Sequence, residues 1–168
     1  MSVLVYTESE KGKFKKIALE VASYAKAVAD QMGTTVTAIT VNADDVSELG
    51  TYGVDKVLKV NDGKLDMFNA KTYANIIKQA AEKEGSKVVV VSQSADSKYL
   101  APILAVNLHA GYASNVVEAP TSASPFTVKR TAFTNKAFNF TTIDTDVKIV
   151  GVSNNSFGLK ENSGSASA

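Results

Sequence analysis

With 168 residues, of which 45% are hydrophobic and 21% charged, the chain has the composition of one soluble globular domain. Its net charge is only +1, so charge gives no reason to expect a nucleic-acid partner, and no apolar run is long enough for membrane insertion. Cysteine is absent and His109 is the only histidine, which excludes disulfides and multi-histidine or thiolate metal sites. The N-terminus does not resemble a signal peptide, so we expect a cytoplasmic protein.

The first 119 residues alternate between segments with strand and helix patterns. Short runs rich in apolar and β-branched residues predict strands at 3–6, 35–41, 56–60, 88–91 and 115–119. Apolar side chains at helical spacing predict one helix that Gly33 ends and a second, over about 69–84, that Gly85 ends. A short helical turn is expected at 46–49, and a third helix from about Lys98 or Leu100 to Leu108.

The later part of the chain has a different pattern. Two alternating strands, 126–133 and 136–142, are joined at Thr134-Asn135, and a further strand follows at 147–152. Residues 159–168 offer nothing to bury and are expected to form a linker or frayed tail.

Together these elements predict an α/β fold, a doubly wound and mainly parallel sheet of the adenine-nucleotide alpha-hydrolase-like type. The expected strand order is 3-2-1-4-5, with the hairpin and the last strand added at one edge in antiparallel or mixed fashion. Right-handed crossovers would place the helices on both faces of the sheet.

Sheets of this kind bind ligands beyond the carboxyl ends of their strands, which here means the loops at 7–13 and 92–97. Neither loop carries a glycine-rich phosphate motif, and the first contains two acids. The second offers weak cofactor-binding candidates at a helix N-terminus: Ser92, Ser94, Ser97 and Lys98. The alternative is that Ser97 or Asp96 only caps the helix.

No catalytic residue is predicted. His109 is the one candidate base for a hydrolase, but it follows a predicted helix, where a structural role at the helix end is expected.

Phenylalanines gather on the predicted hairpin at Phe126, Phe133, Phe138 and Phe140, and strand alternation places Phe138 and Phe140 on one face. We expect that face to pack on the core; the alternative is contact with a partner subunit.

Four segments, in this order, resemble the N-terminal domain of electron-transfer flavoprotein alpha subunits over about residues 2–160. They are 3–14, 52–57, 92–111 and 152–157. The sequence departs from the family where Ser97-Lys98 replaces Gly-Arg and where Ser153-Asn154-Asn155 replaces Arg-Pro-Gly.

The resemblance implies a division of the chain into a domain at 1–158 and a linker or tail at 159–168 toward an absent FAD-binding domain. Family members are about twice as long, so we expect a fragment rather than a natural single-domain relative. In the family the alpha subunit pairs with a beta subunit, and the heterodimer uses FAD to carry electrons from dehydrogenases to the respiratory chain.

The resemblance assigns this domain to scaffold and subunit contact, with no enzyme activity and no FAD bound by this chain alone. The alternative is a stand-alone adenine-nucleotide-binding domain resembling universal stress proteins.

Overall fold

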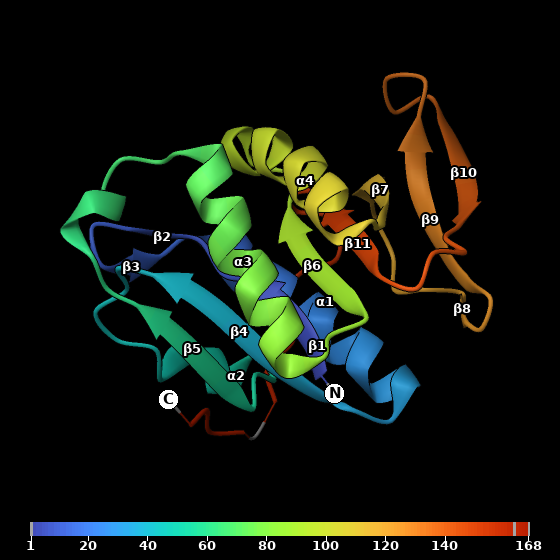
Figure 1. Cartoon of the computed structure of the whole chain (residues 1–168). Helices are drawn as coiled ribbons and strands as arrows, with labels where there is room; N and C mark the ends of the chain where they lie inside the picture. Colours follow the sequence, from blue (N-terminus) through green and yellow to red (C-terminus); the bar gives the residue numbers. More distant parts are fainter. Residues whose placement is uncertain (1, 163, 168) are drawn as a thin grey trace.

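The computed structural model describes residues 2–162 and 164–167. Its main sheet has the strand order β10-β9-β7-β11-β6-β1-β4-β5 (Figure 1). Adjacent strands from β7 to β5 pair in parallel. Their bounds, in sheet order, are β7 (Gly111–Val116), β11 (Lys148–Val152), β6 (Val88–Ser92), β1 (Ser2–Tyr6), β4 (Thr35–Val41) and β5 (Lys56–Val60).

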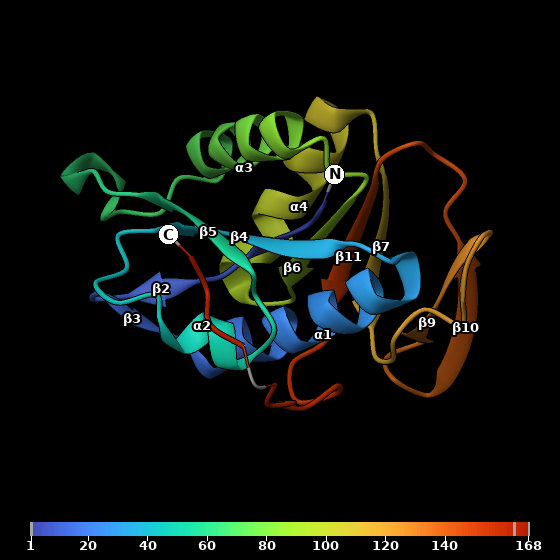
Figure 2. The ribbon, with the colours of Figure 1, turned by 90° about the horizontal axis from the view of Figure 1, so that it is seen from below.

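Helices cover both faces of this sheet, as Figure 2 shows. One face carries α1 (Lys16–Met32) and the short α2 (Glu48–Thr51). The other carries α3 (Ala70–Glu84) and α4 (Ala95–Leu108), with the single turn η1 (Gly63–Leu65) preceding α3. The predicted doubly wound α/β class is therefore confirmed. In the described part of the chain, no helix is long and apolar enough to cross a membrane.

The two long helices end as their sequences predict. Gly33 and Gly85 follow α1 and α3 with φ values of 62° and 61°, the left-handed conformation that glycine adopts without steric penalty.

The valine run in β6 supplies both cores. Val88 and Val90 pack in the core beneath α1, whereas Val89 and Val91 pack in the core beneath α3 and α4. Side chains that alternate between two buried faces are typical of a central parallel strand. β6 is therefore an inner strand of the sheet, and it pairs with β1.

The predicted position of the last strand is wrong. The sequence pattern suggested that residues 147–152 extend an edge, but β11 lies between β6 and β7 and pairs in parallel with both. Its Ile149, Val150 and Val152 are completely buried. A strand with such side chains needs a strand on each edge and helices over both faces of the sheet. Glycine at position 151 leaves room for the end of the Gln93 side chain, whose Nε2 would lie 1.9 Å from a Cβ there.

Several predicted bounds shift as well. The third helix begins at Ala95, earlier than predicted, because Ser94 caps it. His109 adopts a left-handed conformation (φ 50°) at its end, so β7 begins already at Gly111. Short strands that the sequence did not indicate form within predicted loops: β2 (Ser9–Glu10), β3 (Lys13–Phe14) and β8 (Ser122–Ala123).

The predicted hairpin exists as β9 (Phe126–Ala132) and β10 (Ala137–Thr142), and it extends the sheet edge in antiparallel fashion. The expectation that the face carrying Phe138 and Phe140 packs on the core is wrong, because these rings are 62% and 61% exposed. Of the other two phenylalanines, Phe126 packs in the core and is 3% exposed, whereas Phe133 is 80% exposed.

A buried carboxylate holds the segment that follows β11. Glu20 of α1 is 2% exposed and accepts hydrogen bonds from the backbone N–H groups of Asn155 (2.8 Å), Phe157 (2.9 Å) and Gly158 (2.9 Å). The Phe157 ring packs edge-on against Tyr24, with centroids 5.1 Å apart. Glu20 therefore holds against α1 the end of the last of the four segments that carry the family resemblance, 152–157.

The residues after this clasp differ from the expected unpacked tail. Lys160 N–H donates to Ser23 Oγ at 3.1 Å, and Asn162 N–H donates to the Thr51 carbonyl at 2.6 Å. Val57 N–H then donates to the Ser167 carbonyl at 2.8 Å, beside the edge strand β5. The C-terminal segment, red in Figure 2, thus passes along α1 and α2 to β5.

A pH-dependent ion pair joins α3 to the same edge of the sheet. Lys56 Nζ lies 2.7 Å from Glu84 Oε1, and this hydrogen bond and charge hold the pKa of the Glu84 carboxyl below its ordinary value. We expect Glu84→Gln to lower the free energy of unfolding by up to about 1 kcal/mol at neutral pH. A lowered pKa stabilises the fold above the unfolded-state value of about 4.3, and this contribution is lost as pH falls through the folded-state value.

Urea unfolding at neutral and at acidic pH measures this difference. The exposed substitution Glu82→Gln serves as the control, since its partner Lys78 is 3.7 Å away on the same helix. An effect of Glu84→Gln that is equally large at both pH values would contradict the assignment.

Candidate functional site

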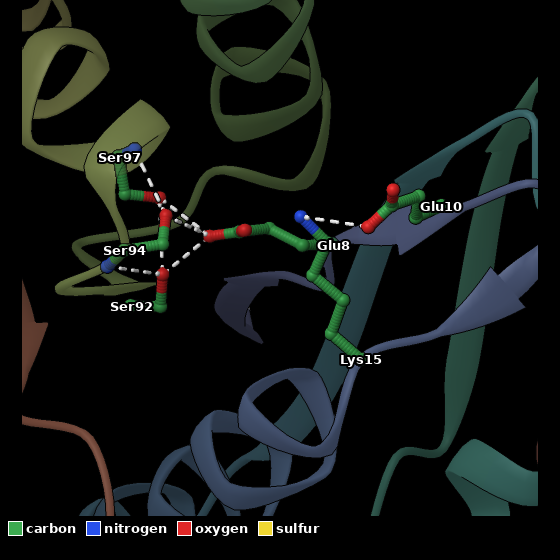
Figure 3. Close-up of polar contacts among 6 residues, drawn as sticks. All are labelled: Glu8, Glu10, Lys15, Ser92, Ser94 and Ser97. Carbon is green, nitrogen blue, oxygen red and sulfur yellow. Dashed lines mark hydrogen bonds and ion pairs between the residues drawn. The ribbon is translucent and has the colours of Figure 1, made fainter.

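The two loops that the sequence analysis singled out meet at the carboxyl edge of the sheet. Glu8 lies just after β1, Ser92 ends the neighbouring strand β6, and Ser94 and Ser97 lie at the start of α4. Figure 3 shows the three serines converging on the end of the Glu8 side chain. Residues 84 or more positions apart in sequence thus form one polar cluster.

Glu8 is the centre of this cluster. It is only 4% exposed, and its Oε1 accepts hydrogen bonds from the hydroxyl groups of Ser94 and Ser97, both at 2.8 Å. Ser92 donates a third, short hydrogen bond to the same oxygen. Hydrogen bonds to a charged acceptor are the strong kind, and three hydroxyl donors compensate the burial of the carboxylate.

The same serines build the start of α4. Ser94 Oγ accepts a hydrogen bond from Ser97 N–H at 3.1 Å and so caps the helix, while Ser92 Oγ accepts from Ser94 N–H at 3.1 Å. The predicted cap was Ser97 or Asp96, so the capping residue is corrected to Ser94. Glu8 therefore lies beside a helix N-terminus, where the helix dipole favours negative charge.

This carboxylate occupies the place that an anionic ligand takes in related folds. In doubly wound sheets, phosphate groups bind at a helix N-terminus near the point where the strand order reverses. Here β1 and β6 are the central strands, and the hydroxyls at the start of α4 already bind Glu8. The serine hydroxyl groups that could donate to a phosphate therefore donate to the Glu8 carboxylate.

A pocket of about 600 Å³ adjoins the cluster. Its acidic lining residues outnumber its basic ones: Glu8, Glu10, Asp66 and Asp96 against Lys11 and Lys15. Lys15 is also partly neutralised, since its Nζ lies 3.5 Å from Glu10 Oε2. The charge of the pocket wall therefore opposes the binding of a phosphate or pyrophosphate.

Aromatic rings also line the pocket. Tyr73 packs edge-on against Tyr6 and Phe68, with centroids 6.2 and 5.0 Å apart, and its hydroxyl donates to the Leu65 carbonyl at 2.6 Å. Burial, followed by the nearby Glu8 carboxylate, raises the pKa of the Tyr6 phenol well above its ordinary value. Tyr6 is therefore a neutral hydroxyl at physiological pH, rather than an ionised nucleophile or base.

The structure brings together three of the four weak cofactor-binding candidates. Ser92, Ser94 and Ser97 share the Glu8 carboxylate, whereas Lys98 is exposed on α4 and does not line the pocket. From the sequence, Glu8 was only one of the two acids in the loop at 7–13, and its contact with the serines was not predicted. A glutamate directly after a buried central strand, opposite a loop with three serines, was the available signal.

His109 lies at the end of α4, as its predicted structural role requires. It is exposed, and its backbone N–H donates to the Val106 carbonyl at 3.2 Å. It is far in sequence from Glu8 and does not line the 600 Å³ pocket.

Fold and site together define a doubly wound α/β domain in which an internal carboxylate, Glu8, accepts hydrogen bonds from the hydroxyl groups at the N-terminus of α4. Residues 3–168 match the family model described as "Electron transfer flavoprotein domain". The chain belongs to the electron transfer flavoprotein family, as the sequence resemblance implied.

Curated relatives agree with this assignment. The electron transfer flavoprotein subunit alpha of Bacillus subtilis (strain 168) is 26% identical over 137 residues, 81% of this chain and 42% of that protein. The subunit alpha of Megasphaera elsdenii is 27% identical over 119 residues, 69% of this chain and 35% of that protein. The acryloyl-CoA reductase electron transfer subunit beta of Anaerotignum propionicum is 26% identical over 112 residues, 65% of this chain and 30% of that protein. The chain thus matches less than half the length of each.

The family name implies a flavin, but the N-terminus of α4 and the pocket beside it do not fit the pyrophosphate of FAD. Such a group needs free backbone N–H groups or basic side chains at a helix N-terminus. At α4 those positions are taken by the contacts among Glu8, Ser94 and Ser97, and the pocket beside them is predominantly acidic.

Proposed function

We propose that this chain is the N-terminal scaffold and subunit-contact domain of an electron-transfer flavoprotein alpha subunit. The observation that carries the proposal is the Glu8 carboxylate, which is buried among three serine hydroxyls where the fold would otherwise bind phosphate. A domain that closes its own ligand crevice has no flavin chemistry of its own. Its ordered sheet and two cores then serve to present surfaces to the rest of a larger protein.

The function of the larger protein forms part of the same proposal. The alpha subunit pairs with a beta subunit, and their heterodimer holds FAD and carries electrons from dehydrogenases to the respiratory chain. The heterodimer itself is a cytoplasmic protein. It is an electron carrier rather than an enzyme, because the redox step belongs to the flavin and protein groups only tune it. Names of the relatives support this: they are described as electron transfer flavoprotein subunits.

The domain division also belongs to the proposal. Residues 1–158 form the N-terminal domain, and 159–168 lead toward a second, FAD-binding domain. The clasp between Glu20 and the turn at 155–158 fastens the end of the proposed domain to α1, and the described residues after it hydrogen-bond to α1, α2 and β5 before the chain would continue.

Flavin retention by the purified chain tests the proposal. We expect FAD to separate from the protein on gel filtration, with no flavin absorbance in the protein peak. The acidic side chains of the pocket repel the pyrophosphate, and the serine hydroxyls at the start of α4 already bind Glu8. Stoichiometric FAD in the protein peak would contradict the proposal. Thermal-shift titration with ATP and AMP tests the universal-stress-protein alternative, and an increase of several degrees in Tm would favour it.

A further inference from the structure

The 600 Å³ pocket at the carboxyl edge of the sheet contains a buried hydroxyl group without a partner. Tyr6, the last residue of β1, lines this pocket and is only 5% exposed. No described residue hydrogen-bonds to its hydroxyl, whereas the hydroxyl of the neighbouring Tyr73 donates to the Leu65 carbonyl. The fully enclosed side-chain atoms without a partner in the described chain belong to Tyr24 and Arg130. The Tyr6 hydroxyl is not enclosed in this way, so it faces the space of the pocket.

One oxygen of Glu8 is a second such group. The hydrogen bonds from the three serines all end on Oε1, as the dashed lines in Figure 3 show. Oε2 of the same carboxylate has no partner among the described residues, although Glu8 is 4% exposed and lines the pocket. Buried polar atoms are nearly always hydrogen-bonded, so two unpaired atoms that face one pocket indicate that a ligand supplies the missing donors.

The charge of the pocket wall indicates that this ligand is a cation. Four carboxylates and two lysine ammonium groups line the pocket, which leaves a net charge of −2. One of the lysines, Lys15, lies 3.5 Å from the Glu10 carboxylate and compensates it. The other three carboxylates are opposed by Lys11 alone. A cleft with an excess of one charge concentrates ligands of the opposite charge.

The remaining wall and the volume fit an organic cation. The rings of Tyr6, Phe68 and Tyr73 line the pocket. Aromatic rings pack against alkyl chains, and their faces attract cationic nitrogen. A volume of about 600 Å³ is in the range of pockets that enclose a whole small molecule, and it exceeds the needs of one amino-acid side chain. In the described chain, the acidic residues form no group of three that could hold a metal ion.

We propose that this pocket binds an alkyl polyamine, a methylene chain that carries two or more ammonium groups. The Tyr6 hydroxyl and Glu8 Oε2 accept hydrogen bonds from one ammonium group, and the aromatic rings contact the methylene chain. Asp66 and Asp96 compensate the remaining positive charge. The Glu8 carboxylate thus excludes a phosphate and admits an amine. This activity is additional to the proposed function and involves neither FAD nor the beta subunit.

Isothermal titration calorimetry of the purified chain with spermidine tests the proposal. We expect one-to-one binding with a Kd of about 1 mM or tighter, which is attainable for a ligand of this size. The titration is made at about 0.15 M salt, which screens attraction to exposed surface charges. The uncharged 1,8-octanediol has a similar length, and we expect it not to bind.

Tyr6→Phe is the sharpest variant, because it keeps the ring and removes only the unpaired hydroxyl. We expect an unchanged unfolding midpoint in urea and about tenfold weaker spermidine binding, since a hydrogen bond to a charged group is lost. Tyr99→Phe is the matched control, because its side chain is 73% exposed and does not line the pocket. We expect Tyr99→Phe to bind spermidine as the unaltered chain does.

A second pair of variants tests the charge of the wall. Asp96→Asn removes one carboxylate charge from the pocket, and we expect about two- to fivefold weaker spermidine binding. Glu82→Gln makes the same change of charge on α3 outside the pocket, and we expect it to have no effect.

Four results would overturn the proposal. The first is no binding of spermidine, and the second is binding that both Tyr6→Phe and Asp96→Asn leave unchanged. The third is Mg²⁺ that displaces spermidine, which would assign the pocket to a metal ion. The fourth is Nα-acetyl-lysine methylamide that binds as tightly as spermidine, which would assign the pocket to a lysine side chain of another protein. Each of them leaves the proposed function intact, because that function is tested by flavin retention and subunit binding.

Discussion

Replacing Glu8 by alanine is expected to lower the free energy of unfolding by about 2–4 kcal/mol. The substitution removes the acceptor that three hydroxyl groups share, and Ser92 and Ser97 are completely buried. Buried donors without an acceptor lose hydrogen bonds that water supplies in the unfolded chain. The adjoining pocket admits some water, which keeps the expected effect below that of a fully enclosed site.

Urea unfolding followed by circular dichroism measures this change. Glu10→Ala is the matched control in the same loop, since its side chain is 66% exposed and its ion pair with Lys15 is worth well under about 1 kcal/mol. A Glu8→Ala protein as stable as the Glu10→Ala protein would show that the serine cluster does not depend on the carboxylate.

Glu20→Ala is expected to have a similar effect, about 3 kcal/mol, but with a local consequence as well. Three backbone N–H groups between Asn155 and Gly158 lose their acceptor, and Phe157 loses the contact that holds it on Tyr24. The segment after β11 should therefore open before the rest of the domain unfolds.

Limited proteolysis with mass spectrometry detects this opening. We expect cleavage within 153–162 to become much faster in Glu20→Ala, while the sheet and helices stay resistant. Glu82→Ala, on an exposed position of α3, supplies the comparison. Unchanged cleavage in this segment would contradict the assigned role of Glu20.

The local signals of the sequence were sufficient for the two long helices α1 and α3 and for the strands β1, β4, β5 and β6. Gly33 and Gly85 mark helix ends through a conformation that other residues avoid, and four consecutive valines identify a strand buried on both faces. Such signals depend on residues that are neighbours in the chain, so one sequence is enough to read them.

The failures concern contacts between distant segments. The position of β11 depends on packing against β6 and β7, 60 and 37 positions away in the register (Lys148 with Val88 and with Gly111), and its residue pattern does not specify an inner position. The outward direction of Phe138 depends on which face of the hairpin meets the core. Alternation showed that Phe138 and Phe140 share a face but could not show which one.

In the candidate site, one part was predictable from local sequence signals and the other depends on a contact between distant segments. The hydroxyl-rich loop and its helix N-terminus were identifiable from sequence, because serine is a preferred capping residue. The partner of those hydroxyls, Glu8, belongs to a loop 84 positions earlier, and only the folded sheet brings the two together. That contact changes the interpretation of the loop from a weak ligand crevice to an internally satisfied polar cluster.

Sedimentation velocity of the chain mixed with its cognate beta subunit and FAD, recorded at protein and flavin wavelengths, tests the central claim most directly. The proposed function predicts a one-to-one complex with the beta subunit and no flavin signal that sediments with this chain in the absence of the beta subunit. Two results would contradict the proposed function, in which the domain is a scaffold that contacts the beta subunit and does not bind FAD by itself. One is flavin that sediments with the chain alone, and the other is a chain that stays monomeric in the presence of the beta subunit.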